Sequence, residues 1–478
     1  MVMPQKSIRK FHKKAGLWAG LFLLVLSLTG FFLNHDQWRF QYDWTVSNTL
    51  LPESVAEADK KLFQAKTSRP GHANWLIVGG LRGAYISTDG GQQYQLTSRH
   101  QIYALRWFEE RLLAATESGI LQSFDYGQNW QPFALEGLWI NALAVDHHKI
   151  LASIEKTTLV VLNREGGIEH QQGVELPHDE LIDEVNLSRL VRDLHYGRGL
   201  FDDGWSLLLN DVATWLLIFS ILSGTWIWWG LRRLKQRKIL LPSLTDANKN
   251  RSNKAANIKQ MIRLHSYGLV LFSVPLLLLF AVTGVVLDHS EGLGKPLKSV
   301  TVKVEHLPPI YRSLREDIWS VDIEYDEEGV WHYRMGNRYG VYESDSLQDW
   351  QRVSEGFAYR MKRLGDTLYV SGMGAPSRMY HAETGWLNAK LPHMFRDIYT
   401  VNQQNVVFCG HSKKADHHTP KLPDSSFYSI MLTLHDGTFF ASWWVWVNDY
   451  ASLMLLVLLF TGVMRWFKKK HRIGSVRA

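Results

Sequence analysis

The chain has 478 residues, a formal net charge of +7 and a single cysteine, Cys409. One cysteine excludes an internal disulfide, an iron–sulfur cluster held by cysteines and a covalently attached c-type haem. The length exceeds that of one small domain, and the slightly polar mean hydropathy of −0.17 indicates that most of the chain lies outside lipid.

Four apolar segments are nevertheless long enough to cross a bilayer. A run of about 20 apolar residues makes ~30 Å of helix, which matches the hydrocarbon thickness. We do not expect the first segment to be a signal peptide, because no small-x-small cleavage site follows it and its pattern recurs in mid-chain. The expected membrane helices occupy 13–33 (within an N-terminal region 1–34), 207–231, 264–287 and 443–464.

The basic residues predict how these helices are oriented. The connection 232–263 carries ten Lys and Arg against the single acid Asp246, and the tail 465–478 carries six and no acid. By the positive-inside rule both regions and the basic N-terminus are cytoplasmic, so 35–206 and 288–442 lie outside. The rest of the chain is acidic, so its basic balance reflects membrane orientation and not nucleic-acid binding. We expect a multi-pass protein of the bacterial cytoplasmic (inner) membrane with a large periplasmic region.

The two outer segments have the sequence features of β blades. The stretches "STDGGQQY" (87–94) and "SFDYGQNW" (123–130) match the S-x-D-x-G-x-x-W pattern called an Asp-box, with weaker copies at 162–167, 342–350 and 381–386. Alternating strands lie between the copies, which recur at about the length of one four-stranded propeller blade. We expect one all-β, propeller-like domain made of two insertions, with two separate β domains as the alternative.

The membrane segments and their flanks occur twice. "LTGFFLNH" (28–35) corresponds to "VTGVVLDH" (282–289), "LHYGR" (194–198) to "LHDGT" (434–438), and "LLLNDVA" to "VWVNDYA". This repeat predicts a four-helix transmembrane bundle built from a duplicated two-helix unit, with a pseudo-twofold axis along the membrane normal. Small residues in each span permit close approach of helices or of a flat ligand. They are Thr29-Gly30, Ser223-Gly224, Thr283-Gly284 and Thr461-Gly462.

Six histidines occupy matching places in the two halves. Neutral imidazole is the usual axial ligand of b-type haem, which needs no cysteine. The sequence therefore predicts one or two haem b groups, or more, bound at the span ends. No catalytic residue is assigned beyond the haem iron and its ligands. The predicted ligands are His12 and His265 inside, and His35, His195, His289 and His435 outside.

Two ligand pairings respect the repeat. In the first, the inner histidines share one haem, and His35 pairs with His289 outside. However, 23 residues of straight helix span ~35 Å and turn the two ligands of one span away from a common face. In the second, each outer histidine pairs with one that precedes a span, His35 with His435 and His289 with His195.

Three stretches together resemble the PepSY-associated transmembrane helix family. They are "KFHKKAGLWAGLFLLVLSLTGFFLNH", "LHYGRG…SGTWIWW" and "RLHSYGLVLFSVPLLLLFAVTGVVLDH". The resemblance implies an inner-membrane protein of iron acquisition. Some members are haem-containing reductases of ferric siderophores that use histidines at the span ends, a role that falls here on the six histidines above. The chain departs from common members in its outer region, where propeller-like repeats stand in place of a PepSY module.

We therefore expect an enzyme similar to ferric reductases. Electrons would pass from a quinol or a cytoplasmic donor to periplasmic ferric iron or a ferric siderophore. Reduction weakens iron binding to hard oxygen ligands and would release iron for a ferrous importer. The sequence contains no dinucleotide fingerprint between a strand and a helix. The alternatives are a membrane-anchored propeller for binding, sensing or assembly, and a transporter that uses Asp211 and Asp449.

Overall fold

The computed structural model divides into two compact units. A helical unit comprises Met1–Gln41, Glu184–Ile310 and Phe427–Ala478, and a β unit comprises Tyr42–Asp183 and Tyr311–Ser426. The basic connection and tail of the sequence lie partly outside the described residues. The residues that the structure describes are 5–176, 181, 184–201, 204–240, 255–268, 270–312, 317–372, 375–392, 394–409, 416 and 418–474.

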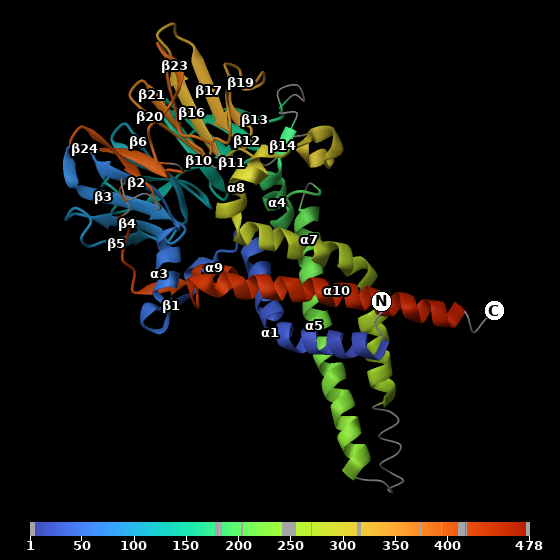
Figure 1. Ribbon diagram of the computed structural model, residues 1–478. Coiled ribbons are helices and arrows are strands. Elements are labelled where there is room, and N and C mark those ends of the chain that lie inside the picture. Colours follow the sequence, from blue (N-terminus) through green and yellow to red (C-terminus); the bar gives the residue numbers. More distant parts are fainter. Residues whose placement is uncertain are drawn as a thin grey trace. The chain divides into compact units, whose positions relative to one another are not determined.

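The helical unit contains the membrane segments (Figure 1). Its long helices are α1 (Gln5–Asn34), α5 (Trp205–Leu240), α7 (Val270–Asp288) and α10 (Val445–Gly474). The shorter elements are α4 (Leu187–His195), a π-helical turn η3 (Leu264–Gly268), α8 (Ser290–Ser299), η4 (Val304–His306), η5 (Pro309–Tyr311, which reaches into the β unit), α9 (Phe427–Asp436), η6 (Ser442–Trp444) and the strand pair β14 (Glu184–Asn186) and β15 (Thr301–Lys303).

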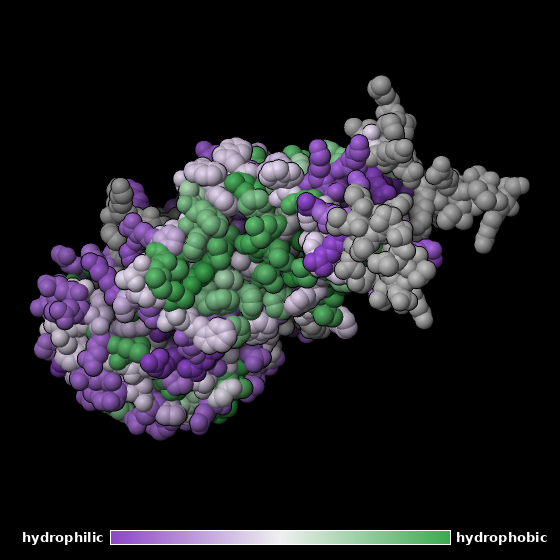
Figure 2. Space-filling model, turned by 90° about the horizontal axis from the view of Figure 1, so that it is seen from below, coloured by the Kyte–Doolittle hydropathy of each residue, from purple (hydrophilic) through white to green (hydrophobic). Residues whose placement is uncertain are grey.

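Length and composition identify three of these helices as able to cross a membrane, and a bent pair as a fourth candidate. The three are Ser7–Asn34, Trp205–Gln236 and Ser442–Phe467, and the bent pair joins Ser273–Asp288 to Gly292–Ser299. Because lipid does not penalise exposed apolar groups, such helices carry large hydrophobic side chains on their outer surface. Figure 2 shows a broad hydrophobic surface over these helices. Large hydrophobic residues exposed on the long helices include Trp18, Leu21, Leu222, Leu453 and Phe460.

Small and aliphatic residues form the interior of the helical unit. Ala19 and Leu23 of α1 pack with Ala281 of α7 and with Ala451 and Leu455 of α10. The small side chains let the backbones approach closely, as is usual between membrane helices. Helix α1 contacts α5, α9 and α10, while α7 contacts α4, α5 and α10. The short helices α4 and α9 are therefore packed against the long ones.

The β unit consists mainly of small antiparallel sheets (Figure 1). Five have four strands, and a sixth has two in the described part of the chain. In order they are β2 (Phe63–Arg69), β3 (His72–Gly80), β4 (Gly83–Ser87), β5 (Gln95–Ser98); β6 (Ile102–Phe108), β7 (Arg111–Thr116), β8 (Gly119–Ser123), β9 (Gln131–Ala134); β10 (Ile140–Asp146), β11 (Lys149–Ile154), β12 (Thr158–Leu162), β13 (Ile168–Gly173); β16 (Ser320–Tyr325), β17 (Trp331–Gly336), β18 (Gly340–Ser344), β19 (Gln351–Glu355); β20 (Arg360–Leu364), β21 (Thr367–Ser371), β22 (Arg378–His381), β23 (Gly385–Asn388); and β24 (Asp397–Val401), β25 (Gln404–Phe408).

The first strands of these sheets lie next to one another in cyclic order. Strand β2 contacts β6, β6 contacts β10, β10 contacts β16, β16 contacts β20, β20 contacts β24, and β24 contacts β2. The first strands of the six sheets are therefore neighbours around the β unit. A strand pair of β1 (Thr45–Ser47) and β26 (Asp424–Ser426) joins the beginning and end of the unit, and α2 (Phe40–Asp43), η1 (Asn48–Leu50) and α3 (Glu53–Lys60) precede the first blade.

The two outer segments share hydrophobic clusters within the β unit. One cluster joins Leu151 and Val161 to Met335 and Tyr342, and another joins Phe63 to Phe408. The side chains of the Asp-boxes hold turns of the backbone. In the second, Ser123 Oγ accepts the Gly127 N–H at 2.8 Å and Asp125 Oδ1 accepts the Asn129 N–H at 2.8 Å.

Candidate functional site

Four of the six predicted histidines share one arrangement in the helical unit. Each ring bonds through Nδ1 to the hydroxyl of a Ser or Thr that directly precedes a glycine on another helix. The sequence repeat is therefore also a repeat of contacts. The bonds are His12 to Thr461 (2.7 Å), His265 to Ser223 (2.8 Å), His195 to Thr283 (2.9 Å) and His435 to Thr29 (2.9 Å).

The hydroxyl groups determine which ring nitrogen carries the proton. Thr29 donates its only hydroxyl hydrogen to the Val25 carbonyl at 2.8 Å, and Thr283 and Thr461 each donate to the carbonyl four residues earlier at 2.7 Å. Ser223 donates to the Ser220 carbonyl at 3.2 Å. A hydroxyl that has donated its hydrogen can only accept from the ring, so each Nδ1 is protonated. Each Nε2 therefore keeps its lone pair and is the atom that can bind a metal.

The glycine after each hydroxyl lies against the same imidazole. A Cβ added at Gly30 would be 3.2 Å from Cε1 of His435, and one at Gly284 would be 3.5 Å from Cε1 of His195. The corresponding distances are 3.5 Å at Gly224 and 3.9 Å at Gly462. At Gly30 the added atom would be tighter than an ordinary contact, so the His435 ring would have to shift, whereas at the other three positions it would make an ordinary van der Waals contact. Each glycine thus lies directly against a histidine ring, and Gly30 most closely.

His195 and His435 form the outer pair. They end α4 and α9, and their ring centroids are 6.5 Å apart with planes inclined at 53°. Burial, together with the neighbouring His435, lowers the pKa of His195 to about 4, and burial also lowers the pKa of His435 to about 4. Both rings are therefore neutral at pH 7, which is the form that binds a metal.

Matching residues hold the ends of α4 and α9 in place. The side-chain amide of Asn210 donates to the His195 carbonyl at 3.2 Å, and that of Asn448 donates to the His435 carbonyl at 2.9 Å. Gly197 and Gly437 follow two residues after each histidine with φ of +65° and +83°, values that favour glycine. Helix α4 begins at Asn186, whose side chain accepts the Arg189 N–H.

His12 and His265 form the inner pair. Their rings are close enough for their charges to interact, and Arg465 of α10 lies near both. The hydroxyl partners come from α5 and α10, so four elements meet at this point. His12 and Thr29 are both on α1 and are separated by 17 residues. At ~1.5 Å per residue, the inner and outer pairs lie ~26 Å apart along that helix.

His35 and His289 have a different environment. His35 Nε2 lies 3.3 Å from Asp211 Oδ2, and His289 Nε2 lies 2.7 Å from Asp449 Oδ2. Both aspartates are the second residue of the repeated Asn-Asp pair. The Asn of each pair holds the end of α4 or α9, as described above. The nitrogen that would bind iron is here occupied by a carboxylate.

The structure therefore brings together a pair that neither sequence scheme contains, His195 with His435. It places His12 and His265 together, as both schemes allow, and directs His35 and His289 to separate aspartates. Sequence reasoning identified the hydroxyl–glycine pairs but missed that each hydroxyl receives a histidine. The signal in the sequence was the matching order of each His and its hydroxyl–glycine pair along the two halves of the chain. Within the described residues, no group of three or more His, Cys, Asp and Glu is placed to hold a bare metal ion.

Three solved structures illustrate the similarities that comparison finds, each with low sequence identity. An ancestral GH74 enzyme matches with a TM-score of 0.30 and 11% identity, over 69% of this chain and 31% of its own. The extracellular domain of a one-component system from B. thetaiotaomicron matches with a TM-score of 0.29 and 10% identity, over 70% and 36%. BamB from Moraxella catarrhalis gives 0.27 and 10%, over 72% and 70%. The chain thus spans about a third of the length of the first two.

No curated protein matches the chain. The sequence profile of the PepSY-associated TM region matches residues 141–469, which include α4, α5, α7, α9 and most of α10 and therefore four of the six predicted histidines. That range exceeds two thirds of the 478 residues. The chain belongs to the family of the PepSY-associated TM region.

Proposed function

We propose that the helical unit binds haem b at two sites, through His195 and His435 outside and through His12 and His265 inside. The separation of the outer rings carries the proposal. A metal bonded at about 2 Å to one nitrogen of each of two rings holds their centres roughly 6 Å apart. The measured 6.5 Å fits a single iron between His195 and His435.

The hydrogen bonds between the ring Nδ1 atoms and the hydroxyl groups support the same assignment. Metal-binding histidines commonly donate their second N–H to a nearby acceptor, which fixes the tautomer and the ring orientation. The Thr and Ser hydroxyls have that role at all four rings. At the inner pair, Arg465 supplies a positive charge that suits a propionate group.

Haem b, when bound, supplies a centre that gains and loses one electron at a time. The chain's own residues orient the imidazoles, keep them neutral and surround them with apolar helices that exclude water. Two such sites ~26 Å apart along α1 cover most of the ~30 Å hydrocarbon layer. This spacing suits electron transfer across the membrane.

We infer that electrons enter from a quinol or a cytoplasmic donor and leave at the periplasmic face of the inner membrane. The acceptor in this proposal is ferric iron or a ferric siderophore, and a ferrous importer would take up the product. The basic connection and tail support the orientation, and the family resemblance supports the acceptor. The four helices form the bundle of a duplicated unit, and the β unit is a six-bladed propeller.

The absorption spectrum of the purified full chain tests the proposal. We expect a sharp Soret band that shifts on reduction with dithionite, with about two haems per chain by pyridine haemochrome assay. A folded, colourless protein from haem-replete cells would contradict haem binding. The anchored β unit would then be the functional part of the chain.

The hydroxyl partners give a second test, at Thr283. Thr283→Val keeps the shape but leaves the His195 Nδ1–H buried without its acceptor, which costs about 1–3 kcal/mol. Loss of such a partner commonly weakens metal binding roughly 10–100-fold. We expect weaker haem retention and a shifted midpoint potential at the outer site, measured by redox titration.

Thr283→Ser is the matched control, because it restores the hydroxyl and should restore both properties. Equal haem retention and equal potential in the wild type and in Thr283→Val would contradict the assigned hydrogen bond.

A further inference from the structure

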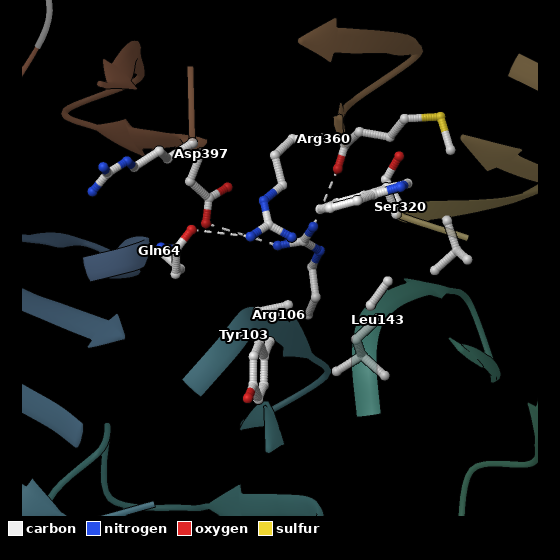
Figure 3. A pocket seen from close by; sticks show the side chains of 13 residues that line it. Gln64, Tyr103, Arg106, Leu143, Ser320, Arg360 and Asp397 are labelled. Atoms are coloured by element: carbon white, nitrogen blue, oxygen red, sulfur yellow. Dashed lines mark hydrogen bonds and ion pairs between the residues drawn. The ribbon is translucent and has the colours of Figure 1, made fainter. Parts of the chain in front are cut away.

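The innermost strands of the β unit enclose a small cavity with an excess of positive charge (Figure 3). Residues from β2, β6, β10, β16, β20 and β24 line it, so every blade contributes. The cavity contains about 290 Å³ of atom-free space, part of which is open to solvent. Much of this space is narrow, with room for one small group.

Two guanidinium groups meet in the centre of this cavity. Figure 3 shows Arg106 and Arg360 reaching it from opposite sides, with their guanidinium groups next to each other. Arg106 donates to the Met361 carbonyl at 3.2 Å, and Arg360 donates to Gln64 Oε1 at 3.1 Å. Burial and the charge of Arg360 both lower the pKa of Arg106, against the opposing effect of Asp397. The two like charges therefore repel each other in a poorly solvated place.

The carboxylate of Asp397 does not balance these charges. It lies 3.8 Å from Arg106 and 3.3 Å from Lys362, so it is already shared by two cations. Arg360 and Arg396 have no carboxylate partner among the described residues. Arg396 instead donates to the Phe63 carbonyl. Four cations thus face one acid.

The neighbouring acids are engaged elsewhere. Asp322, Glu324 and Glu343 surround Arg334 and Arg363 in a network of their own. That network has one net negative charge, and Asp322 acts on Arg106 at longer range. It lowers the local excess from three positive charges to two but does not remove it.

Arg360 also has an unused donor. Its Nε is buried and has no hydrogen-bond partner in the described part of the chain. A buried donor without a partner destabilises the folded state, and more so when the group is charged. An anion in the cavity would satisfy Nε and separate the two guanidinium charges. Guanidinium groups bind planar carboxylates through paired hydrogen bonds.

We propose that this cavity binds one carboxylate group of a small organic anion, between Arg106 and Arg360. The narrow space favours a flat carboxylate over a tetrahedral phosphate. The site lies wholly within the β unit, so it does not depend on haem binding in the helical unit.

Isothermal titration of the full chain in detergent, in a buffer without other carboxylates or phosphate, tests the proposal with citrate and with inorganic phosphate. We expect citrate to bind, and to bind about tenfold or more weakly to Arg360→Gln, because one charge-assisted hydrogen-bond set is lost. Arg164→Gln, which removes an exposed arginine of the same unit, should leave citrate binding unchanged. Binding of phosphate alone, or equal citrate binding by both variants and the wild type, would overturn the proposal.

Thermal unfolding supplies a second measurement that does not require a titration. Without an added anion, Arg360→Gln should unfold at a higher temperature than the wild type, because the repulsion from Arg106 is removed. Citrate should raise the unfolding temperature of the wild type but not that of the variant. An unfolding temperature lowered by Arg360→Gln in both conditions would mean that Arg360 is a structural residue and would overturn the site.

Discussion

Replacing His435 by Ala should remove the outer haem and leave the inner one. His435 of α9 bonds to Thr29 of α1, and its ring centroid lies 6.5 Å from that of His195. Its removal takes away one of the two imidazoles on that iron, and no other histidine of the described chain replaces it at Thr29. The haem content per chain should fall from two to one, measured by pyridine haemochrome assay against protein concentration.

The controls for this prediction are His35→Ala and His289→Ala, at two residues that the sequence alone assigns to the haems. In the structure their Nε2 atoms face Asp211 and Asp449. Both variants should therefore keep two haems. Loss of haem from either control, together with full retention in His435→Ala, would contradict the pair seen in the structure. It would favour the first pairing predicted from the sequence, His35 with His289.

The difference between sequence and structure at this site has a physical cause. The repeat, the long apolar helices and all six histidines follow from residue patterns, because apolar length and spacing determine which segments are helical and which positions match. Which histidines meet depends on α4 and α9, two short helices that pack against α7 and α1. Sequence assigned their residues to the outer β segments, since a nine- or ten-residue helix gives only a short periodic signal.

The contacts of the two Asn-Asp pairs could not be predicted from the sequence either. The sequence shows that Asn210-Asp211 and Asn448-Asp449 match between the halves, and it offers Asp211 and Asp449 as the functional residues of a transporter. Only coordinates show that each Asn holds the carbonyl of an outer histidine while each Asp binds His35 or His289. Adjacent residues on a helix point about 100° apart, so two neighbours necessarily serve two different contacts.

The cavity of the β unit could not be predicted from the sequence, for a different reason. Arg106, Arg360 and Asp397 lie on strands that are far apart in the chain, and arginine is common on protein surfaces. The Asp-box turns predicted the blades but not which side chains of the innermost strands meet. The excess of buried charge appears only after the blades are arranged around a centre.

Replacing His265 by Ala should interrupt electron transfer across the bilayer while the outer haem remains. The inner and outer pairs share no histidine and lie ~26 Å apart along α1. Without the inner haem, an electron would have to cross most of the membrane in one step. Proteoliposomes loaded with ferricyanide and treated externally with dithionite measure this transfer through the loss of ferricyanide absorbance. Wild-type vesicles should reduce ferricyanide, and those with His265→Ala should lose most of that rate.

The matched control is His306→Ala, which removes an exposed histidine of the helical unit that lies 3.6 Å from Glu305. It should transfer electrons at the wild-type rate, and empty vesicles should give the leakage rate. The outer site of His265→Ala should still show a Soret band, which separates loss of the inner site from loss of the fold. If His265→Ala vesicles reduced ferricyanide at the wild-type rate, electrons would reach the outer haem without the inner one. That result would be expected if a quinol were oxidised beside His195 and His435. The inner pair would then have a role other than transmembrane transfer.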